Sequence, residues 1–361
     1  MLDSARFMPK PIIAVLAGEQ LFASFFDAPR RARLSGIARW RLISTPDVTN
    51  GRIGTPRKRQ LDGSSSNRLL TAALAGVEAL ITTWDSPYLS AGLMDEIETV
   101  RMIAHCGGEV KRKFETSLFR KLVIVNTPGP MSRPTAELGA AFLLYLARNV
   151  DHYRVLLRSR SNRIYGDFHA KGEGTDSLLG REVGMIGFGR IGRALVEMLR
   201  GFDIRWRVYD PYASRGMAGG SSVQFVSLNS VLTRSTLLVV TAAATEKTRH
   251  LLNQERLATL QDGTAVVNIA RGSLIDLSAL TDEVRKGRLR CALDVTDPDE
   301  PLPIGHPLRT LPGAIITPHV GGGGRQTRGQ MADGAMDELQ RFFRGKRVEN
   351  RVTTAMLRRM T

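Results

Sequence analysis

The 361-residue chain has few of the residues that form disulfide bonds or bind structural metal ions. It contains 2 cysteines, Cys106 and Cys291, and 6 histidines. Two cysteines are too few for a disulfide framework or a four-cysteine zinc site, so we expect no metal. No apolar run approaches the roughly 18 residues that a membrane-spanning helix needs, and Met1–Lys10 lacks the apolar stretch of a secretory signal. These absences favour a cytoplasmic protein with no membrane partner.

Acidic residues are also in short supply. The chain has 51 Lys and Arg against 35 Asp and Glu, a net charge of +16. Such an excess is typical of proteins that bind nucleic acid or attract anionic ligands. The basic residues are spread along the chain, however, and aromatic residues do not alternate with them as they do on single-strand binding surfaces. We therefore expect no nucleic-acid partner, and a basic surface without a specific role stays open.

The hydrophobic pattern predicts an α/β protein of two domains. A chain of this length exceeds one small core, and short apolar runs alternate with helical patterns, as in parallel doubly wound sheets. Strands are expected at Ile12–Ala17, Leu80–Thr83, Met102–His105, Val123–Asn126, Leu237–Thr241, Ala265–Ile269, Cys291–Val295 and Ile315–Thr317. Long helices are expected at Pro134–Asn149 and Gln326–Phe343. The stretch Thr49–Arg68, rich in Gly, Ser and basic residues, is expected to be an exposed loop.

One glycine-rich segment carries a nucleotide-binding pattern. Gly187, Gly189 and Gly192 form G-x-G-x-x-G after the apolar run Val183–Ile186, and a helical apolar stripe follows. The first glycine allows a tight turn, the second lets backbone approach a pyrophosphate, and the third lets helix and strand pack closely. About 20 residues further on, Asp210 ends a short strand, as such a site requires. The context predicts a dinucleotide site, whereas the glycines alone would also fit a turn that binds nothing.

Polar side chains follow three of the expected strands in the second half. Arg271 follows one strand, the acids Asp297, Asp299 and Glu300 follow the next, and His319 follows the last. Because ligands of open α/β sheets bind outside the carboxyl ends of the strands, we expect these segments to converge on one cleft. This combination suits reduction of a 2-oxo acid. The guanidinium binds a carboxylate, the imidazole supplies a proton, and the acid keeps the imidazole protonated.

The order of these motifs resembles the D-isomer-specific 2-hydroxyacid dehydrogenase family across nearly the whole chain. The matching stretches are Gly184–Gly192 with Asp210-Pro211, Val267–Gly272 with Leu274–Asp276, Ala292–Val295, Glu300–Pro303, His306–Leu308 and Ile316–Gly322. The resemblance implies a Rossmann-type doubly wound NAD-binding domain over residues 131–324. It also implies a smaller flavodoxin-like α/β substrate domain formed by residues 1–130 and 325–361. Arg271, Glu300 and His319 are then the catalytic residues.

The resemblance also implies the ligands and the residues that bind them. The cofactor is expected to be NAD, bound by Gly187, Phe188, Gly189, Arg190, Ile191, Gly192, Asp210, Thr241, Ala270, Asp294 and Gly322. A small 2-oxo or 2-hydroxy acid is expected to contact Arg271, His319 and the backbone N–H groups of Cys106, Gly107 and Gly108. For Asp294 a second interpretation, orienting a loop by hydrogen bonds, stays open.

Two departures from the family pattern bear on these expectations. The family usually has Gly-x-Gly followed by Asp, whereas this chain has Gly107-Gly108-Glu109-Val110-Lys111, which leaves the substrate open. An extra residue within Asp297–Asp299 leaves three acids that could pair with His319, and the spacing from Glu300 to His306 favours Glu300.

The same scaffold leaves other functions open. Another dehydrogenase of the superfamily is one of them, although a formate dehydrogenase would be expected to carry Gln at position 300. A non-enzymatic, corepressor-like NAD-sensing protein is the other. The family also implies a homodimer, for which the helix over residues 134–148 could serve.

Overall fold

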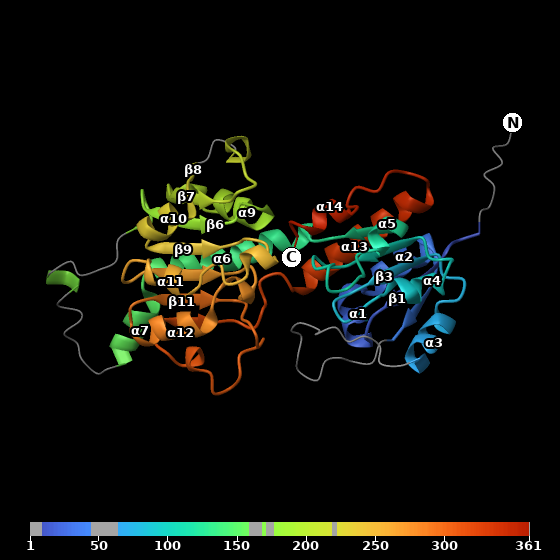
Figure 1. Ribbon diagram of the computed structural model, residues 1–361, viewed down its shortest axis with the longest axis horizontal. Helices are drawn as coiled ribbons and strands as arrows, with labels where there is room; N and C mark the ends of the chain where they lie inside the picture. Colours follow the sequence, from blue (N-terminus) through green and yellow to red (C-terminus); the bar gives the residue numbers. More distant parts are fainter. Residues whose placement is uncertain (1–8, 45–63, 159–167, 171–176, 219–221, 361) are drawn as a thin grey trace. The chain divides into compact units, whose positions relative to one another are not determined.

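The chain forms two separate α/β units. The computed structural model describes residues 9–44, 64–158, 168–170, 177–218 and 222–360 (Figure 1). The first unit comprises Met1–Pro130 and Gly324–Thr361, and the second comprises Met131–Gly323. Each unit has its own parallel sheet.

In the first unit, five strands form a parallel sheet in the order β2-β1-β3-β4-β5 among the described residues. Because β1 lies between β2 and β3, the strand order reverses between β1 and β3. Strands β3 and β4 are buried along their whole length, as expected for parallel strands covered on both faces. The elements are β1 Ile12–Leu16, α1 Glu19–Phe25, α2 Ala28–Ile37, β2 Arg39–Ile43, α3 Ser64–Ala73, β3 Ala79–Thr82, α4 Ala91–Asp95, β4 Met102–His105, α5 Leu118–Lys121, β5 Val123–Asn126, α13 Arg325–Phe343 and α14 Thr354–Leu357.

In the second unit, seven strands form a parallel sheet in the order β12-β11-β10-β9-β6-β7-β8, again counting described residues. The strand order reverses between β6 and β9. The elements are α6 Ser132–Ala147, α7 Val150–Arg158, β6 Glu182–Ile186, α9 Arg190–Met198, β7 Arg205–Tyr209, β8 Val223–Phe225, α10 Leu228–Arg234, β9 Leu237–Val240, α11 Gln254–Ala258, β10 Ala265–Asn268, α12 Leu277–Arg285, β11 Arg290–Leu293 and β12 Ala314–Ile316.

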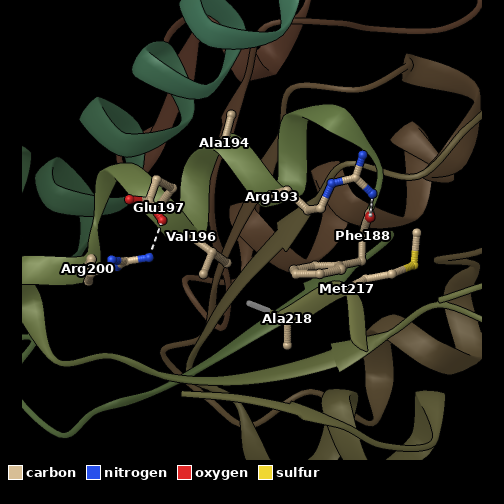
Figure 2. A pocket seen from close by; sticks show the side chains of 8 residues that line it. All are labelled: Phe188, Arg193, Ala194, Val196, Glu197, Arg200, Met217 and Ala218. Carbon is tan, nitrogen blue, oxygen red and sulfur yellow. Dashed lines mark hydrogen bonds and ion pairs between the residues drawn. The ribbon is translucent and has the colours of Figure 1, made fainter. Parts of the chain in front are cut away.

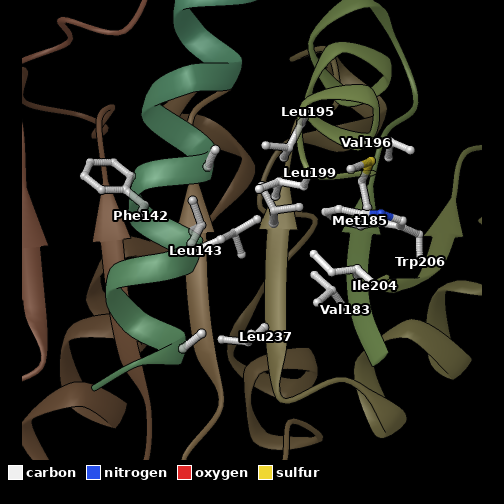
Figure 3. Packing of buried hydrophobic residues seen from close by; sticks show 14 of the residues in the cluster. Phe142, Leu143, Val183, Met185, Leu195, Val196, Leu199, Ile204, Trp206 and Leu237 are labelled. Atoms are coloured by element: carbon white, nitrogen blue, oxygen red, sulfur yellow. The ribbon is translucent and has the colours of Figure 1, made fainter. Parts of the chain in front are cut away.

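Apolar side chains of α6 and α9 pack against one face of this sheet. Figure 3 shows Phe142 and Leu143 of α6 and Leu195 of α9 directed toward the strands, where Met185 and Trp206 lie. These five side chains are at most 6% exposed. The apolar residues of α6 that face the sheet are therefore buried within its own unit, and the expectation that this helix serves a dimer contact stays a prediction.

Every strand expected from the sequence has a counterpart in the structure, but the strands β2 and β8 were not expected, and one expected loop is partly helical. Residues 64–68, expected to be loop, begin helix α3, while residues 49–63 of that stretch lie outside the described residues. Ser and Asn, which are frequent at helix starts, carry no apolar periodicity, so the pattern did not indicate a helix there. No helix in the described part of the chain is long and apolar enough to cross a membrane.

Candidate active site

The three glycines of the fingerprint each occupy the kind of place that the motif requires. Gly187 has φ +93°, and a Cβ there would lie 2.5 Å from the Cα of Ala242. A Cβ at Gly192 would lie 2.9 Å from the carbonyl oxygen of Gly187, so α9 packs closely on β6. At Gly189, which is exposed and precedes α9, a Cβ would meet nothing within 4 Å. The turn is therefore closed on the protein side and open at the start of the helix, where anions are favoured.

Two side chains hold this turn from neighbouring strands. Thr241, just after β9, donates its hydroxyl to the carbonyl of Gly187 at 2.6 Å. Asp210, just after β7, accepts the backbone N–H of Phe188 at 2.7 Å and that of Tyr212 at 2.8 Å. Asp210 thus lies directly beside the turn, where a ribose is expected in such a site. Arg190 is exposed and Ile191 half-buried in the first turn of α9.

The side chain of Phe188 belongs to the interior of the second unit. Its ring packs edge-on against Phe225, with centroids 5.4 Å apart, and is 2% exposed. It lines a hollow of about 330 Å³ together with Arg193, Ala194, Val196, Glu197, Arg200, Met217 and Ala218 (Figure 2). Half of the lining residues belong to α9, beyond its first three residues and so away from the positive end of the helix dipole. Any cofactor contact of Phe188 is therefore limited to its backbone.

Three loops that carry the predicted catalytic residues leave adjacent strands at the same level. Asn268 ends β10, opposite Leu293 at the end of β11, which in turn lies opposite Ile316 at the end of β12. The chain then continues in each case into the segment with Arg271, Glu300 or His319. The parallel register thus brings these three loops to one edge of the sheet.

Arg271 is held in place by its own loop. Asn268 donates its amide to the carbonyl of Arg271 at 2.9 Å and accepts the N–H of Ala270 at 3.1 Å. The Arg271 guanidinium donates to the carbonyl of Ala270 at 2.7 Å. Ala270 is 4% exposed, so the predicted cofactor contact of its side chain has little accessible surface. The Arg271 side chain itself is half-buried.

Gly272 brings the arginine loop against the acidic loop. A Cβ at Gly272 would lie 2.1 Å from the carbonyl carbon of Thr296, so only glycine fits there. Thr296 in turn donates its N–H to one oxygen of Glu300 at 3.2 Å and its hydroxyl to the carbonyl of Asp299 at 2.5 Å. Asp297 faces another way, with an oxygen 3.7 Å from Arg249.

Glu300, and neither of the two aspartates, contacts the imidazole of His319. Its second oxygen lies 3.0 Å from Nδ1 of His319. Because an ionised carboxylate only accepts hydrogen bonds, Nδ1 carries the proton of this bond, and Nε2 is the nitrogen left to exchange a proton. The Glu300 side chain is 13% exposed and that of His319 is 40% exposed. The pairing predicted from the spacing is present in the structure.

Asp294 organises the loop that carries His319. Its carboxylate accepts the hydroxyl of Thr317 at 2.5 Å and the N–H groups of Val320 and Gly321, each at 2.9 Å. Its carbonyl accepts the N–H of His319 at 2.9 Å. His319 has φ +54°, a left-handed conformation that a non-glycine residue adopts only when its surroundings hold it there. The loop-orienting interpretation of Asp294 is thus the one with observed contacts.

Gly322 lies in the same loop beside the start of α6. A Cβ there would lie 3.2 Å from the Thr135 hydroxyl oxygen and 3.2 Å from Cβ of Met131, so a larger residue would displace its neighbours. The expected cofactor contact of Gly322 stays a prediction.

The predicted substrate loop of the first unit is more closed than expected. Cys106 is fully buried, with its thiol toward the carbonyl of Met331 and its N–H bonded to Thr82. The N–H of Gly107, also buried, donates to His105 at 3.0 Å. Both amides have backbone partners in the structure, and the substrate contacts expected of Cys106 and Gly107 stay predictions. Gly108 is half-buried, and its carbonyl accepts the amide of Asn126 at 2.9 Å.

Two functional positions lay outside the sequence expectations. Asn268 and Thr296 hold the loops of Arg271 and Glu300, and both could have been noticed as polar residues that follow buried strands. No group of three or more His, Cys, Asp or Glu residues suited to a metal ion occurs within the described ranges.

Comparisons with known proteins agree with this arrangement. The sequence profile described as D-isomer specific 2-hydroxyacid dehydrogenase, NAD binding domain, matches residues 140–321. The D-3-phosphoglycerate dehydrogenase of Methanocaldococcus jannaschii is 30% identical over 72% of this chain and 48% of that protein. The hydroxypyruvate reductase of Thermotoga maritima is 30% identical over 64% of this chain and 74% of that protein. The crystal structure of a phosphoglycerate oxidoreductase from Rhizobium etli is 26% identical, with a TM-score of 0.72, and covers 95% of this chain and 98% of that one.

The extent of these matches differs among the relatives. The chain spans about half the length of the phosphoglycerate dehydrogenase but most of the length of the reductase. The family profile covers half of the chain, including the glycine turn, Arg271, Glu300 and His319. The chain belongs to the D-isomer specific 2-hydroxyacid dehydrogenase family, whose members are nicotinamide-dependent oxidoreductases acting on CH–OH groups.

Proposed function

We propose that this protein is an NAD-dependent D-2-hydroxyacid dehydrogenase that interconverts a small 2-oxo acid and its 2-hydroxy acid. The observation that carries the proposal is the Glu300–His319 pair, in which Oε2 and Nδ1 lie 3.0 Å apart. The pair lies at the edge of the sheet where the strand before Arg271 also ends. The relatives named as hydroxypyruvate reductase and D-3-phosphoglycerate dehydrogenase support the same class of substrate. A panel of glyoxylate, hydroxypyruvate, pyruvate and phenylpyruvate, followed by NADH consumption, tests it.

The residues divide the chemistry among themselves. When bound, the nicotinamide supplies the hydride for reduction of the carbonyl carbon. Arg271 binds the substrate carboxylate, because a guanidinium presents two parallel N–H donors to two carboxylate oxygens. His319 holds a proton at Nε2 and gives it to the carbonyl oxygen as negative charge develops there. Glu300 stabilises the imidazolium and fixes the orientation of the ring through Nδ1.

The residues of the glycine turn fit NAD. Gly189 leaves space for a pyrophosphate at the start of α9, and Asp210 lies at the turn where it can accept hydrogen bonds from ribose hydroxyl groups. The same carboxylate would repel the 2′-phosphate of NADP. Arg205, Arg207 and Arg215 lie near Asp210 in sequence. Arg207 is 6% exposed, however, and its guanidinium is engaged with Glu182, Gln224 and Ser230.

A non-enzymatic NAD-sensing protein is the second candidate on this scaffold. It would need the cofactor site but no proton donor. The supported Glu300–His319 pair and the closely packed Gly272 have no evident use in such a protein, which favours the enzyme. Turnover of any 2-oxo acid separates the two.

We also propose a homodimer, as the family resemblance implies. The support is helix α7, in which no residue is buried and three apolar side chains are exposed: Val150 at 41%, Val155 at 43% and Leu157 at 73%. Val150 and Leu157, seven residues apart, lie on the same side of the helix, and exposed apolar side chains there favour association with a second apolar surface.

The rate of reduction tests the role of Glu300. Glu300→Gln removes the negative charge beside His319 and with it the electrostatic support of the group that donates the proton, so kcat for reduction should fall by about 10-fold or more. Asp299→Asn is the control and should keep the parent kcat. A loss of kcat in the control variant but not in Glu300→Gln would show that the wrong acid has been assigned.

Substitution of Arg271 tests substrate binding. Arg271→Ala removes charged hydrogen bonds to the carboxylate, and kcat/KM for the 2-oxo acid should fall by at least about 100-fold. Binding of NADH, measured by its fluorescence, should persist because the guanidinium is assigned to the substrate. Arg271→Lys should recover only part of the activity, since an ammonium group does not match two oxygens at once. A lysine variant as active as the parent would contradict two-point binding.

Cofactor preference tests the role of Asp210. The parent should have a higher kcat/KM with NADH than with NADPH, and Asp210→Ala should narrow the difference because it removes the carboxylate that repels the 2′-phosphate. The measurement is initial-rate kinetics with both cofactors at a fixed substrate concentration. A parent that prefers NADPH would reverse the assignment.

Sedimentation equilibrium tests the dimer. The parent should sediment as a dimer, and Leu157→Glu should shift it toward monomer, because the substitution places a charge on an apolar contact surface. Leu69→Glu is a matched control in the other unit, where Leu69 is 74% exposed. Equal masses for the parent and Leu157→Glu would remove α7 from the interface.

A further inference from the structure

The loop that follows β9, residues 242–253, has no part in the proposed reaction. Strands β9, β10, β11 and β12 are neighbours in the sheet of the second unit, and Val240 at the end of β9 lies opposite Asn268 at the end of β10. The chain therefore leaves β9 at the same edge of the sheet as the three loops with the predicted catalytic residues. We call residues 242–253 the β9 loop.

Backbone hydrogen bonds join the β9 loop to the arginine loop, residues 269–276. The N–H of His250 donates to the carbonyl of Ser273 at 2.8 Å, and that of Leu252 donates to the carbonyl of Leu274 at 3.0 Å. Leu252 and Leu274 are fully buried, so this pairing lies in the interior of the unit. The position of the arginine loop therefore depends on the β9 loop.

The acidic loop contacts the arginine loop one residue earlier. A Cβ at Gly272 would lie 2.1 Å from the carbonyl carbon of Thr296 and 2.5 Å from the backbone nitrogen of Asp297. Gly272 thus touches the acidic loop, and Ser273 is bonded to the β9 loop. Because Arg271 directly precedes both contacts, a displacement of either neighbouring loop is transmitted to it.

An ion pair links the β9 loop directly to the acidic loop. Nη2 of Arg249 lies 3.7 Å from Oδ2 of Asp297, and the two side chains are 56% and 22% exposed. The β9 loop contacts the arginine loop, the arginine loop contacts the acidic loop, and the ion pair joins the acidic loop back to the β9 loop. The three loops therefore form a closed ring of contacts around Gly272.

The backbone on both sides of Arg249 fixes the direction of its side chain. Before it, the Thr248 hydroxyl donates to the carbonyl of Ala243 at 2.8 Å and accepts the N–H of Thr245 at 2.7 Å. After it, His250 has φ +45°, a left-handed conformation that a non-glycine residue adopts only when its surroundings hold it there. Strained residues of this kind are frequent at functional sites, so the loop is constrained where it presents Arg249.

We propose that Arg249 and Asp297 are positioning residues that hold the arginine loop between its neighbours and thereby fix the direction of Arg271. This inference rests on the proposed function, because it gives an ion pair outside the catalytic residues a role in reduction. A guanidinium that binds a carboxylate through two parallel donors depends on its orientation, and a small displacement lowers the rate of the reaction it supports.

A role limited to the stability of the fold suits this ion pair less well. Ion pairs that reach solvent contribute little to stability, because water screens the charges and two long side chains lose freedom. The left-handed His250 beside Arg249 costs more free energy than such a pair contributes. The pair thus determines the geometry of the loops more than the stability of the unit.

Charge reversal tests the proposal. Arg249→Asp places two like charges side by side, so kcat/KM for a 2-oxo acid should fall by at least about 5-fold, and Asp297→Arg should have a similar effect. The double variant restores opposite charges and should recover most of the parent value. The Kd of NADH, measured by its fluorescence, should stay at the parent value in each variant. A double variant no more active than the single ones would overturn the proposal.

The Arg285–Asp282 pair of α12 is the matched control. It is likewise exposed and belongs to the same unit, with its nitrogen and oxygen 2.5 Å apart. Arg285→Asp should keep the parent kcat/KM. Thermal unfolding of every variant should stay within about 4 °C of the parent Tm, because each change affects an ion pair that reaches solvent. If Arg249→Asp does not fold, Arg249→Met removes the charge without adding a repulsion and should still lower kcat/KM.

Amide hydrogen exchange measures the arginine loop independently of the reaction. The N–H groups of residues 274–276 are hydrogen-bonded to the carbonyl groups of Arg271, Gly272 and Leu252, at 3.3, 3.1 and 2.9 Å. Exchange of a peptide that contains them should be about 5-fold faster in Arg249→Asp, because the loop opens more often. The double variant should return to the parent rate, and Arg285→Asp should not differ from the parent.

The two measurements distinguish the possible failures. If the parent reduces no 2-oxo acid but exchange at residues 274–276 follows the charges at positions 249 and 297, the proposed function fails and the ion pair still holds the arginine loop. If 2-oxo acids are reduced and neither kcat/KM nor exchange responds to charge reversal, the inference fails alone. A fall in kcat/KM without faster exchange would assign Arg249 to a ligand and would also overturn the inference.

Discussion

The buried carboxylate of Asp294 is the constraint on which the candidate active site depends. It accepts three hydrogen bonds from residues 317–321, and its own carbonyl accepts the N–H of His319. Four bonds to one residue hold His319 in a left-handed conformation that would otherwise be unfavourable. Because Asp294 directly follows β11, the imidazole is positioned relative to the sheet and not merely relative to its own loop. The Glu300 contact then only has to orient the ring.

Close backbone contacts explain why the glycine positions of the motifs could be recognised in the sequence. The neighbours of Gly187, Gly192 and Gly272 leave too little space for a Cβ, so only glycine fits at these positions. A glycine in the sequence therefore identifies the close contact. Gly189 is different, since a Cβ there would meet nothing within 4 Å, and we propose that its glycine lets a pyrophosphate approach the backbone. The strands were equally predictable, because parallel strands buried on both faces leave continuous apolar runs. The family assignment and the two-sheet fold could therefore be reached from the sequence.

Other contacts were not predictable, because they join segments that are distant in the sequence. Trp84 and Arg328 stack across the first unit although the whole second unit lies between them in the chain. The burial of Cys106 and Gly107 depends on α13 and on hydrogen bonds that no local pattern records. The start of α3 carries no apolar period, so only tertiary packing distinguishes it from a loop. The spacing of residues in the sequence identifies the candidate functional residues. Packing in the folded protein determines which of their atoms remain accessible to a ligand.

Arg271 is supported in a way that matches its proposed role. It donates to a backbone carbonyl in a loop held by Asn268, so hydrogen bonds fix the orientation of the guanidinium. Such a group suits the 1-carboxylate, which has the same geometry in every 2-oxo acid.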